Sequence, residues 1–394
     1  MKKIIIVGAG ASGVFLALNL KNKDNEIILL EKNDTPLKKL SMTGNGRCNY
    51  YNDDQNIKHY HSESLNELNY LLKEKDIKRC LELFNELGIY PRIINGYYYP
   101  YSNNAKTIRN TLIEELNKKN IKLKLNYEVN NIKKKDNKFI INNDLTSDYL
   151  VISTGSKCMV NDYIMYDILK EMKIDIIKPL PGLTKLVVDN KYLNKLNGIR
   201  TLCKASIIVN DEVIKEEEGE LQLTNYGLSG IVIFNLSRYA SINLEKNNNV
   251  KVKINFLHTI QNIEEIFVKN NNIKSALNRI LDEKLVNVLL KDLKNLNYNE
   301  LTKEEKNELF KILTEYEFIV TGIKDFNNCQ VSVGGVSLNE VDLKSLESLK
   351  ISNLYFTGEI LDVDGDCGGY NLTFAWLSAL IVSRSIRRKN DKSK

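Results

Sequence analysis

The sequence predicts an α/β protein in which a doubly wound domain, built from both ends of the chain, is interrupted by an inserted region. Three observations support this prediction. A strand, a glycine-rich turn, a helix and a second strand follow one another at the start of the chain. The middle of the chain changes to short alternating segments and then to helical spacing. Strand character returns near the end and leads into one long helix, as in a doubly wound domain.

The opening segment forms the first strand–helix–strand unit. Lys3 to Val7 is an apolar run of strand length, Ser12 to Lys21 has helical spacing, and Glu26 to Leu30 is apolar again. This pattern predicts two parallel strands joined by a crossover helix.

Helices and strands continue in the next part of the chain. Leucines recur at helical intervals from Ser64 to Leu87, and Thr107 to Lys119 has the pattern of an amphipathic helix. Ile121 to Val129 alternates as a strand does, a hairpin is expected around Lys138 to Ile141, and Tyr149 to Ser153 is a buried strand.

The pattern changes after Pro179 and Pro181. Lys204 to Val209 and Glu220 to Leu223 alternate as exposed strands do, and Leu257 to Phe318 has the spacing of several helices. We therefore expect a β-barrel-like insertion followed by a helical one.

The last segment returns to strands at Gln330 to Val333 and Asn353 to Phe356, before a final helix over Gly368 to Arg387. The predicted domains are a doubly wound domain, first part (1–188), an inserted β-rich domain (189–256), an inserted helical segment (257–324) and the second part of the doubly wound domain (325–394).

Composition excludes several classes of protein. The 394 residues are 43% hydrophobic, which is enough for more than one core. The net charge is +6, but lysines alternate with acidic residues except in the tail from Arg384, so we expect no nucleic-acid partner. The apolar run Ile4 to Leu20 is interrupted by glycines and is followed by no small-residue cleavage site, which predicts neither a signal peptide nor a membrane span.

Cysteine and histidine usage predicts neither a metal site nor disulfides. The six cysteines occur singly, without any C-x-x-C pair, and the chain has three histidines. A cytoplasmic location fits this pattern. The oligomeric state is left open.

The first chemical motif is Gly8-Ala9-Gly10-Ala11-Ser12-Gly13, which lies between a predicted strand and a predicted helix. In the G-x-G-x-x-G motif the glycines allow a tight turn, close approach of a pyrophosphate and close helix packing. Glu31 ends the second strand, where a carboxylate binds ribose hydroxyls and disfavours a 2′-phosphate. The alternative is a glycine turn with an unrelated surface glutamate.

Two further segments have the composition of ligand loops. Lys38 to Asn49 is polar and glycine-containing, with donors suited to phosphate or flavin atoms, and an ordinary surface loop is the alternative. Thr154-Gly155 follows a predicted strand, where ligands of open α/β sheets bind, although a plain turn also explains it.

Near the C-terminus, Glu359 lies just beyond a strand, and the segment from Gly365 to Asn371 opens a helix. Free N–H groups at this helix start would stabilise negative charge on a reduced flavin. The alternating Asp362, Asp364 and Asp366 resemble a calcium loop, but the bidentate glutamate of such a loop is missing.

These motifs together resemble the BaiN-like family of bacterial NAD(P)/FAD-dependent oxidoreductases, also described as aminoacetone oxidase family FAD-binding enzymes. Four blocks carry the likeness, which spans nearly the whole chain. They are Gly8 to Gly13 with Glu31, Thr43 to Asn49, Leu223 to Gly230, and Gly358 to Leu372.

The resemblance implies an FAD-binding, Rossmann-like domain of the two-dinucleotide-binding type, interrupted by a β-barrel-like and a helical segment. With the motifs above, it predicts the cofactor-binding residues Gly8, Gly10, Ala11, Ser12, Gly13, Glu31, Lys32, Lys39, Leu40, Thr43, Gly44, Asn45, Arg47, Cys48, Asn49, Val129, Thr154, Gly155, Gly358, Glu359, Gly368, Gly369, Tyr370, Asn371 and Leu372. NADH or NADPH would serve as a transient electron donor.

The sequence departs from the family at three places. Leu37-Lys38-Lys39 stands where relatives usually have Gly-Arg-Lys, and Asn225 and Ile231 replace a usual His and Pro. The segment after Thr154-Gly155 lacks the glycine-rich continuation of relatives, which changes the local substrate or nicotinamide surface.

The resemblance favours reduction of an activated C=C bond in a small hydrophobic substrate. The alternatives are an aminoacetone-type amine oxidase, a non-catalytic flavin-bound sensor or interaction protein, and flavin-dependent RNA modification. No catalytic residue is assigned. His59, His61 and His258 are interpreted as solvated or structural, Tyr97 to Tyr99 as core or pocket lining, and Cys48 as a loop residue near FAD.

Overall fold

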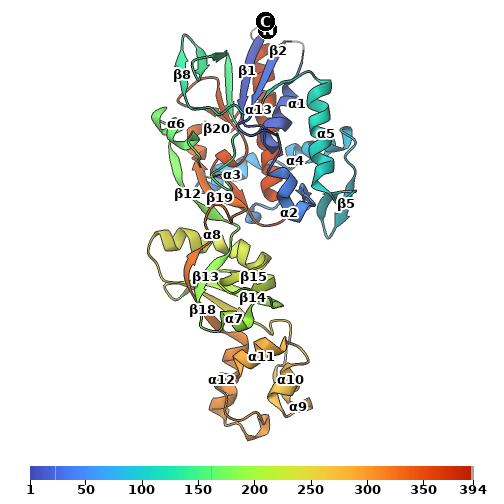
Figure 1. The fold of residues 1–394 in the computed structure, drawn as a ribbon, viewed down its shortest axis with the longest axis vertical. Coiled ribbons are helices and arrows are strands. Elements are labelled where there is room, and N and C mark those ends of the chain that lie inside the picture. Colours follow the sequence, from blue (N-terminus) through green and yellow to red (C-terminus); the bar gives the residue numbers. More distant parts are fainter. Residues whose placement is uncertain (23, 161, 392–394) are drawn as a thin grey trace. The chain divides into compact units, whose positions relative to one another are not determined.

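The computed structural model describes residues 1–22, 24–160 and 162–391, and the chain forms two compact units (Figure 1). Unit 1 contains Met1–Pro179 together with the C-terminal segment from Val331, and unit 2 contains Leu180–Gln330. Each unit has its own hydrophobic core.

Unit 1 is built on a seven-stranded sheet in the order β20-β21-β22-β11-β1-β2-β7. The five strands from β22 to β7 pair in parallel, and β20 and β21 add an antiparallel edge. Their bounds are β1 Lys2–Val7, β2 Asn25–Leu30, β7 Lys122–Lys124, β11 Tyr149–Ile152, β20 Val341–Asp342, β21 Glu347–Ser348 and β22 Leu354–Phe356. The doubly wound fold class predicted from the sequence is confirmed.

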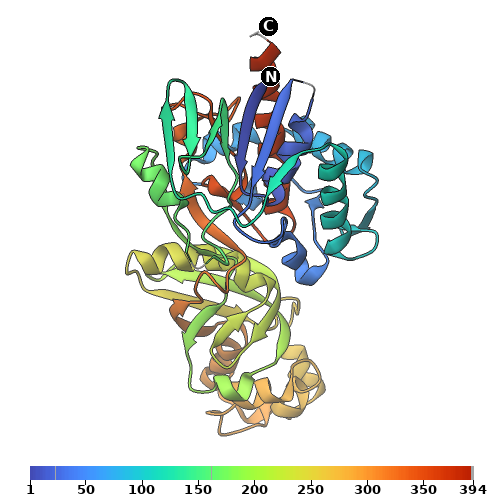
Figure 2. The ribbon, with the colours of Figure 1, turned by 45° about the horizontal axis from the view of Figure 1, so that its top comes forward.

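Helices lie on one side of β1 and β2, and a small antiparallel sheet lies on the other (Figures 1 and 2). The helices are α1 (Ala11–Leu20), α5 (Ala105–Lys118) and α13 (Tyr370–Asp391), and the small sheet contains β8 (Ile132–Lys135), β9 (Lys138–Ile141) and β10 (Leu145–Ser147). Because α1 and β1 are almost wholly apolar, they form the centre of the unit 1 core.

The remaining part of unit 1 consists of helices and short strands outside the central sheet. They are η1 (Leu40–Met42), α2 (Thr43–Gly46), η2 (Ile57–His59), α3 (Leu65–Leu71), α4 (Glu74–Glu86), α6 (Met165–Glu171), η4 (Leu338–Glu340), η5 (Gly358–Ile360) and the strands β3 (Tyr51–Asn52), β4 (Tyr60–His61), β5 (Pro91–Ile94), β6 (Tyr97–Pro100), β12 (Ile176–Gly182), β19 (Val331–Val336) and β23 (Asp364–Gly365). Strand β6 pairs with β3 and β5, and β23 pairs with β4.

Three predicted elements need correction. The helix expected over Ser64 to Leu87 is two helices, since the chain is non-helical at Leu72 and Lys73. The strand expected over Ile121 to Val129 is limited to β7, because Asn126 has a positive φ of 53° and ends the extended run. The loop over Lys38 to Asn49 contains two short helical turns, η1 and α2.

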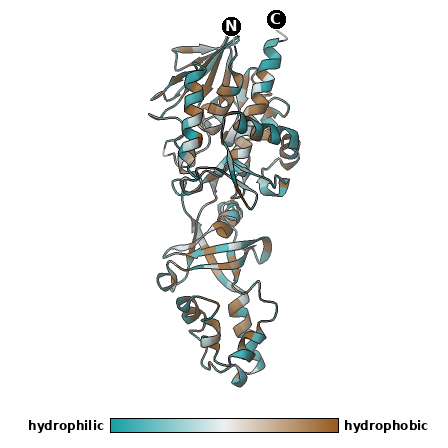
Figure 3. Ribbon diagram, turned by 90° about the vertical axis from the view of Figure 1, so that its right-hand side faces the viewer, coloured by the Kyte–Doolittle hydropathy of each residue, from teal (hydrophilic) through white to brown (hydrophobic). Residues whose placement is uncertain are grey.

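Unit 2 is a closed six-stranded barrel in the order β13-β16-β15-β14-β17-β18. The strands are β13 Leu186–Asp189, β14 Arg200–Val209, β15 Glu212–Leu223, β16 Gly227–Ser229, β17 Val250–Asn255 and β18 Tyr316–Ile323. Apolar residues alternate with polar ones along barrel strands such as β17 (Figure 3). This alternation fills the barrel interior and leaves the polar side chains outside.

The helices of unit 2 alternate with the barrel strands along the sequence. Helix α7 (Leu193–Leu196) and α8 (Ile231–Glu245) lie between barrel strands, whereas α9 (Glu264–Lys269), α10 (Ile273–Leu277), α11 (Glu283–Leu289), η3 (Tyr298–Glu300) and α12 (Lys303–Thr314) lie between β17 and β18. The predicted helical segment is therefore an insertion within the barrel. Across the described residues, no helix combines the length and apolar character needed to cross a membrane.

Candidate active site

The glycine turn between β1 and α1 is closely packed on one side and open on the other. A Cβ atom on Gly13 would lie 2.0 Å from the Gly8 carbonyl oxygen, and one on Gly8 would lie 2.4 Å from the Ser153 oxygen. A Cβ on Gly10 would meet no atom within 4 Å. The first and third glycines are therefore needed for packing, and the second borders open space beside the start of α1.

Glu31 lies at the end of β2 and holds this turn. Its carboxylate accepts hydrogen bonds from the backbone N–H of Ala9 and of Asn33, both at 2.9 Å. The side chain is 8% exposed. It also accepts from the Asn33 side-chain amide at 2.5 Å, so one of the roughly four acceptor positions of a carboxylate remains for a ribose hydroxyl.

A row of hydroxyl groups joins three parallel strands at their carboxyl ends. Ser12 at the start of α1 contacts Ser153 after β11 at 2.8 Å, and Ser153 contacts Thr357 after β22 at 2.7 Å. All three residues are buried. The row brings Thr154-Gly155 and Gly358-Glu359 beside the glycine turn, although the sequence analysis did not single out Ser153 or Thr357.

The turn after β22 is held by hydrogen bonds from several elements. The Gly358 N–H donates to the Ser378 hydroxyl of α13 at 2.8 Å. The Glu359 carboxylate accepts from the Ser156 hydroxyl at 2.7 Å and from the Ser332 N–H at 2.9 Å. A Cβ atom on Gly155 would lie 3.8 Å from the Glu359 carboxylate, so these two predicted residues are neighbours.

The loop after β2 folds back onto the glycine turn. The Leu37 N–H donates to the Ala9 carbonyl at 2.8 Å. Further along, Gly44 and Asn45 both have positive φ, 56° and 55°, so α2 is a tight curl of backbone and not a regular helix. The Cys48 N–H closes the curl on the Thr43 carbonyl at 3.1 Å. The predicted residues of this loop are thus gathered beside the turn.

Two side chains of this loop have contrasting environments. Arg47 is exposed, and its guanidinium lies 5.5 Å from the centre of the Tyr99 ring. Cys48 is buried, and burial raises the pKa of its thiol to about 12. Cys48 is therefore a neutral thiol at physiological pH and a poor nucleophile.

Lys39 has a side chain suited to an anionic partner. Its Nζ atom is buried and has no hydrogen-bond partner among the described residues. A buried ammonium without a partner is costly, so a bound anion is the natural complement. Lys39 lines a pocket of about 570 Å³ beyond the ends of β2 and β7, together with Lys32, Asn33, Lys38, Met42, Asn126, Glu128, Met159, Val160 and Asp162.

The first turn of α13 lies against the same loop. A Cβ atom on Gly369 would lie 2.9 Å from Oδ1 of Asn49, which is buried and unpaired among the described residues. The Asn371 amide donates to the Gly365 carbonyl at 2.8 Å and accepts from the Gly365 N–H at 2.9 Å. Asn371 therefore shapes the turn with its side chain, and its backbone N–H and that of Leu372 belong to the first turn of the helix, where amides have no carbonyl partner within the helix.

Some predicted residues point elsewhere. The Val129 and Leu40 side chains are buried in the unit 1 core, and Ala11 packs against it, so each can reach a ligand only through its backbone. The Thr154 hydroxyl contacts the Tyr163 hydroxyl at 2.7 Å, and the Tyr370 hydroxyl accepts a hydrogen bond from Asn52 at 3.1 Å.

The acidic alternation that resembled a calcium loop has another explanation. The Asp362 carboxylate accepts from the Ser62 hydroxyl at 2.9 Å, and the Asp366 carboxylate contacts His59 and His61, each at 3.0 Å. Among the residues that the structure describes, no group of three or more His, Cys, Asp or Glu side chains could hold a metal ion. The sequence contained no sign of these histidine contacts, because the partners lie about 300 residues apart in the chain.

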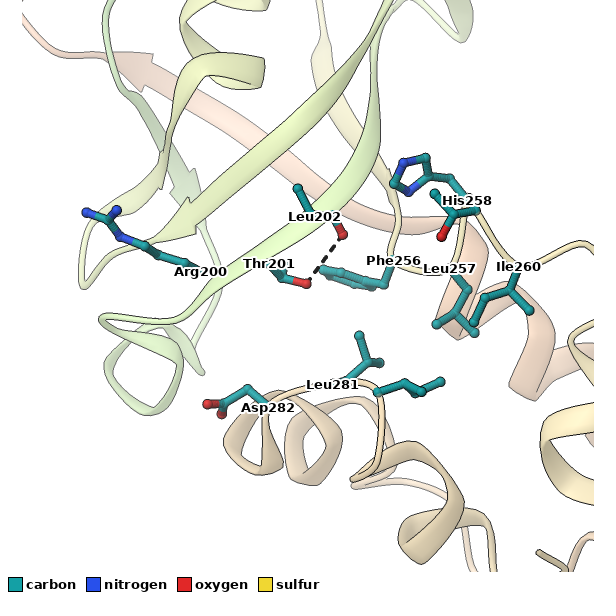
Figure 4. Close-up of a pocket in the computed structure, with 11 residues that line it drawn as sticks. Arg200, Thr201, Leu202, Phe256, Leu257, His258, Ile260, Leu281 and Asp282 are labelled. Carbon is teal, nitrogen blue, oxygen red and sulfur yellow. Dashed lines mark hydrogen bonds between the residues drawn. The ribbon is translucent and has the colours of Figure 1, made fainter. Parts of the chain in front are cut away.

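Unit 2 has a pocket of its own, of about 450 Å³, between the barrel and the following helices (Figure 4). Its lining is mostly apolar, with His258 on one side and Asp282 on the other. Thr201 donates to the Leu202 carbonyl at the pocket wall.

The fold resembles that of a solved flavocytochrome c3 fumarate reductase, with a TM-score of 0.50, 13% identity and coverage of 98% of this chain and 78% of that one. The family model and the curated relatives described below define the class of this protein, which is an FAD-dependent oxidoreductase. The chain belongs to the HI0933-like family, since the model of the HI0933-like protein Rossmann domain matches residues 2–385. The family resemblance inferred from the sequence motifs is thereby confirmed.

Two curated relatives match over almost their whole length. A 3-dehydro-bile acid delta(4,6)-reductase of Clostridium scindens is 31% identical, over 98% of this chain and 99% of the relative. A ribosomal RNA dihydrouridine synthase of Escherichia coli is 27% identical, over 97% of each chain.

Proposed function

We propose that this protein is an NAD(P)H-linked, FAD-dependent reductase of an activated C=C bond in a small hydrophobic substrate. The observation that carries the proposal is the full-length similarity to a reductase of 3-dehydro-bile acids. The proposal includes a reducing, cytoplasmic setting, because the six cysteines occur singly in the sequence without a C-x-x-C pair.

The residues of unit 1 suit FAD. We propose that the pyrophosphate lies over Gly10 and the start of α1, where space is open and helix N–H groups point outward. Glu31 would bind the adenosine ribose, and Lys39 would place its unpaired ammonium beside a phosphate or ribose. The first turn of α13 would face the flavin ring. Bound there, FAD supplies the hydride chemistry, and the protein supplies orientation and electrostatics.

The names of the relatives indicate one kind of bond. A dihydrouridine is a uridine whose ring C=C bond, conjugated to a carbonyl, has gained two hydrogens, and the bile-acid relative is named for reduction at delta(4,6) of a 3-dehydro compound. Both descriptions fit saturation of a C=C bond next to a carbonyl. We therefore propose an α,β-unsaturated carbonyl compound as the substrate class.

An anaerobic titration of the purified protein tests this proposal. Flavin absorbance should bleach with NADH or NADPH, and an enone such as a 3-keto-4-ene steroid should restore it faster than buffer alone. Bleaching by aminoacetone under nitrogen would instead establish an amine oxidase. Bound flavin that no donor or amine reduces would favour a sensor, and reoxidation no faster than in buffer would contradict the enone proposal.

Reduction of a uridine in RNA is the second candidate. It is favoured by the relatives named ribosomal RNA dihydrouridine synthase, and the net charge of +6 is compatible with it. RNA binding that weakens steeply with salt, and dihydrouridine formed in ribosomal RNA by the NAD(P)H-reduced protein, would support this candidate. Absence of both would leave the small-molecule reductase.

A further inference from the structure

Four side chains form a continuous chain of acids and bases in unit 1. Oδ2 of Asp54 contacts Nε2 of His59, Nδ1 of His59 contacts Oδ2 of Asp366, and Oδ1 of Asp366 contacts Nε2 of His61. All three distances are 3.0 Å. Asp54 precedes η2, and His59 lies in it. His61 lies in β4, and Asp366 directly follows β23. The tertiary fold therefore brings these four side chains together.

The hydrogen-bond pattern requires a stored proton. A carboxylate can only accept, and a neutral imidazole donates from one nitrogen alone. His59 lies between two carboxylates, so both of its contacts are hydrogen bonds only if its ring carries two protons or one carboxyl group is protonated. With both contacts made as hydrogen bonds, the row from Asp54 to His61 holds one proton more than a neutral His59 and two carboxylates would.

This row of side chains begins at an exposed residue and continues to residues that are largely buried. The Asp54 side chain is 52% exposed, His59 is 22% exposed, and Asp366 and His61 are 8% and 14% exposed. Burial raises the pKa of Asp366, but its contacts with His61 and His59 more than offset this effect and hold the pKa below its usual value. The exposed end can exchange protons with water, and the inner end cannot do so as readily.

The middle of this row of side chains, His59, lies against the first turn of α13. The His59 ring stacks on Tyr370 with ring centres 4.6 Å apart, and the Asp366 N–H donates to the His59 carbonyl at 2.9 Å. Asn52 donates to both the Gly368 carbonyl and the Tyr370 hydroxyl.

The other ionisable groups around the chain are few. Lys58 contacts Asp54 at 3.4 Å, and Tyr60 lies edge-on to Tyr370. Burial raises the pKa of Tyr97, and the negative charges of Cys367, Asp366 and Asp54 raise it further. The two histidines are the groups of this cluster whose rings can both accept and donate a proton.

We propose that His59, Asp366 and His61 are positioning residues of a proton relay, refilled through Asp54, that serves the reaction at the first turn of α13. This inference rests on the proposed function. Saturating a conjugated C=C bond forms one C–H bond with a hydride from the reduced flavin, which moves the π electron pair toward the carbonyl as an enolate. That pair then returns to the neighbouring carbon and forms the second C–H bond with a proton. The relay would supply that proton, and water would replace it.

Proton coupling can be tested without any substrate. The chain has three histidines, so imidazole NMR signals can be assigned with His59→Gln, His61→Gln and His258→Gln. Asp366→Asn should move the ring-nitrogen signals of both His59 and His61, because the carboxylate that both rings contact is lost. The signals of His258, in unit 2, should keep their positions. Unchanged His59 and His61 signals in Asp366→Asn would overturn the relay.

Stopped-flow measurements then test its role. Reoxidation of the reduced protein by an enone should slow about 100-fold at pH 8 in Asp366→Asn and His59→Gln, and less at pH 6, where solvent protons are abundant. Reoxidation by ferricyanide, which takes electrons without a proton, should stay at the native rate. If Asp366→Asn loses flavin, His61→Gln takes its place.

The two proposals fail in different ways. Native protein that no enone reoxidises at any pH contradicts the proposed function, while the NMR measurement still decides whether the chain shares a proton. Native protein that is reoxidised by an enone, with variants that keep its rate and pH profile, contradicts the relay alone.

Discussion

Gly10 and Gly13 lie in the same turn, but a methyl group at each would meet different surroundings. Gly13→Ala would force a Cβ against the Gly8 carbonyl and should lower the free energy of unfolding by about 2–3 kcal/mol. Gly10→Ala has room and an ordinary φ of −79°, so stability should change by less than about 1 kcal/mol. FAD affinity should nevertheless fall at least tenfold, since the methyl enters the proposed pyrophosphate space. Urea unfolding of the apoprotein and flavin titration separate the two effects, and equal losses of stability would contradict the packing argument.

Lys39 should show the opposite behaviour from a residue that stabilises the fold. Lys39→Met removes a buried ammonium without a partner, so the apoprotein should become more stable by about 1–3 kcal/mol. FAD affinity should fall about tenfold, because a charge-assisted contact is lost. The exposed Lys106→Met serves as the control and should change neither quantity. A destabilised apoprotein with native FAD affinity would show that Lys39 has a purely structural partner.

Asp366 should influence stability in acid. Its folded-state pKa is depressed, so its ionised form adds stability above the unfolded pKa of about 4, and that stability is lost as the pH falls through the folded value. Asp366→Asn should therefore lose less stability between pH 5 and pH 3 than the native protein. Urea unfolding at several pH values measures this difference. Parallel pH curves for the two proteins would contradict it.

At the scale of elements, α13 positions the turn after β22 through one hydroxyl group. Ser378→Ala would leave the buried Gly358 N–H without an acceptor and should cost about 1–3 kcal/mol, with weaker FAD binding. Ser383→Ala is the matched control, since the buried Ser383 hydroxyl bonds only to the Leu380 carbonyl of its own helix. Thermal unfolding with and without FAD measures both. Equal effects of the two substitutions would contradict a special role for Ser378.

Helices and strands were predicted correctly where a single hydrophobic pattern runs through the segment. The prediction was wrong where the backbone conformation of one residue ends the element. The run Lys3 to Val7 is continuously apolar after its first residue, and β1 occupies Lys2–Val7. The alternation of Ile121 to Val129 continues past Lys124, but Asn126 adopts a left-handed conformation that ends the strand. Hydrophobic periodicity does not record such a conformation, so element ends are decided by single residues.

At the scale of the whole molecule, unit 1 needs both ends of the chain. Removal of all residues after Gln330 would take β22 from the sheet and α13 from the core, so we expect an aggregated product without flavin. A fragment of Leu180–Gln330 retains all six barrel strands and a separate core, and it should fold alone without binding FAD. Circular dichroism and size-exclusion chromatography test both products. An unfolded barrel fragment would show that unit 2 depends on unit 1.

The sequence by itself determined the doubly wound class, the glycine turn with Glu31 and the family, because these depend on spacing within short segments. Only the tertiary structure decided that Ser12, Ser153 and Thr357 form one row, that the barrel uses strands on both sides of its helical insertion, and that Asp366 meets His59 and His61. Hydrogen bonds between residues far apart in the chain leave no period in the sequence. They arise when parallel strands end at one edge of a sheet and bring their following residues together.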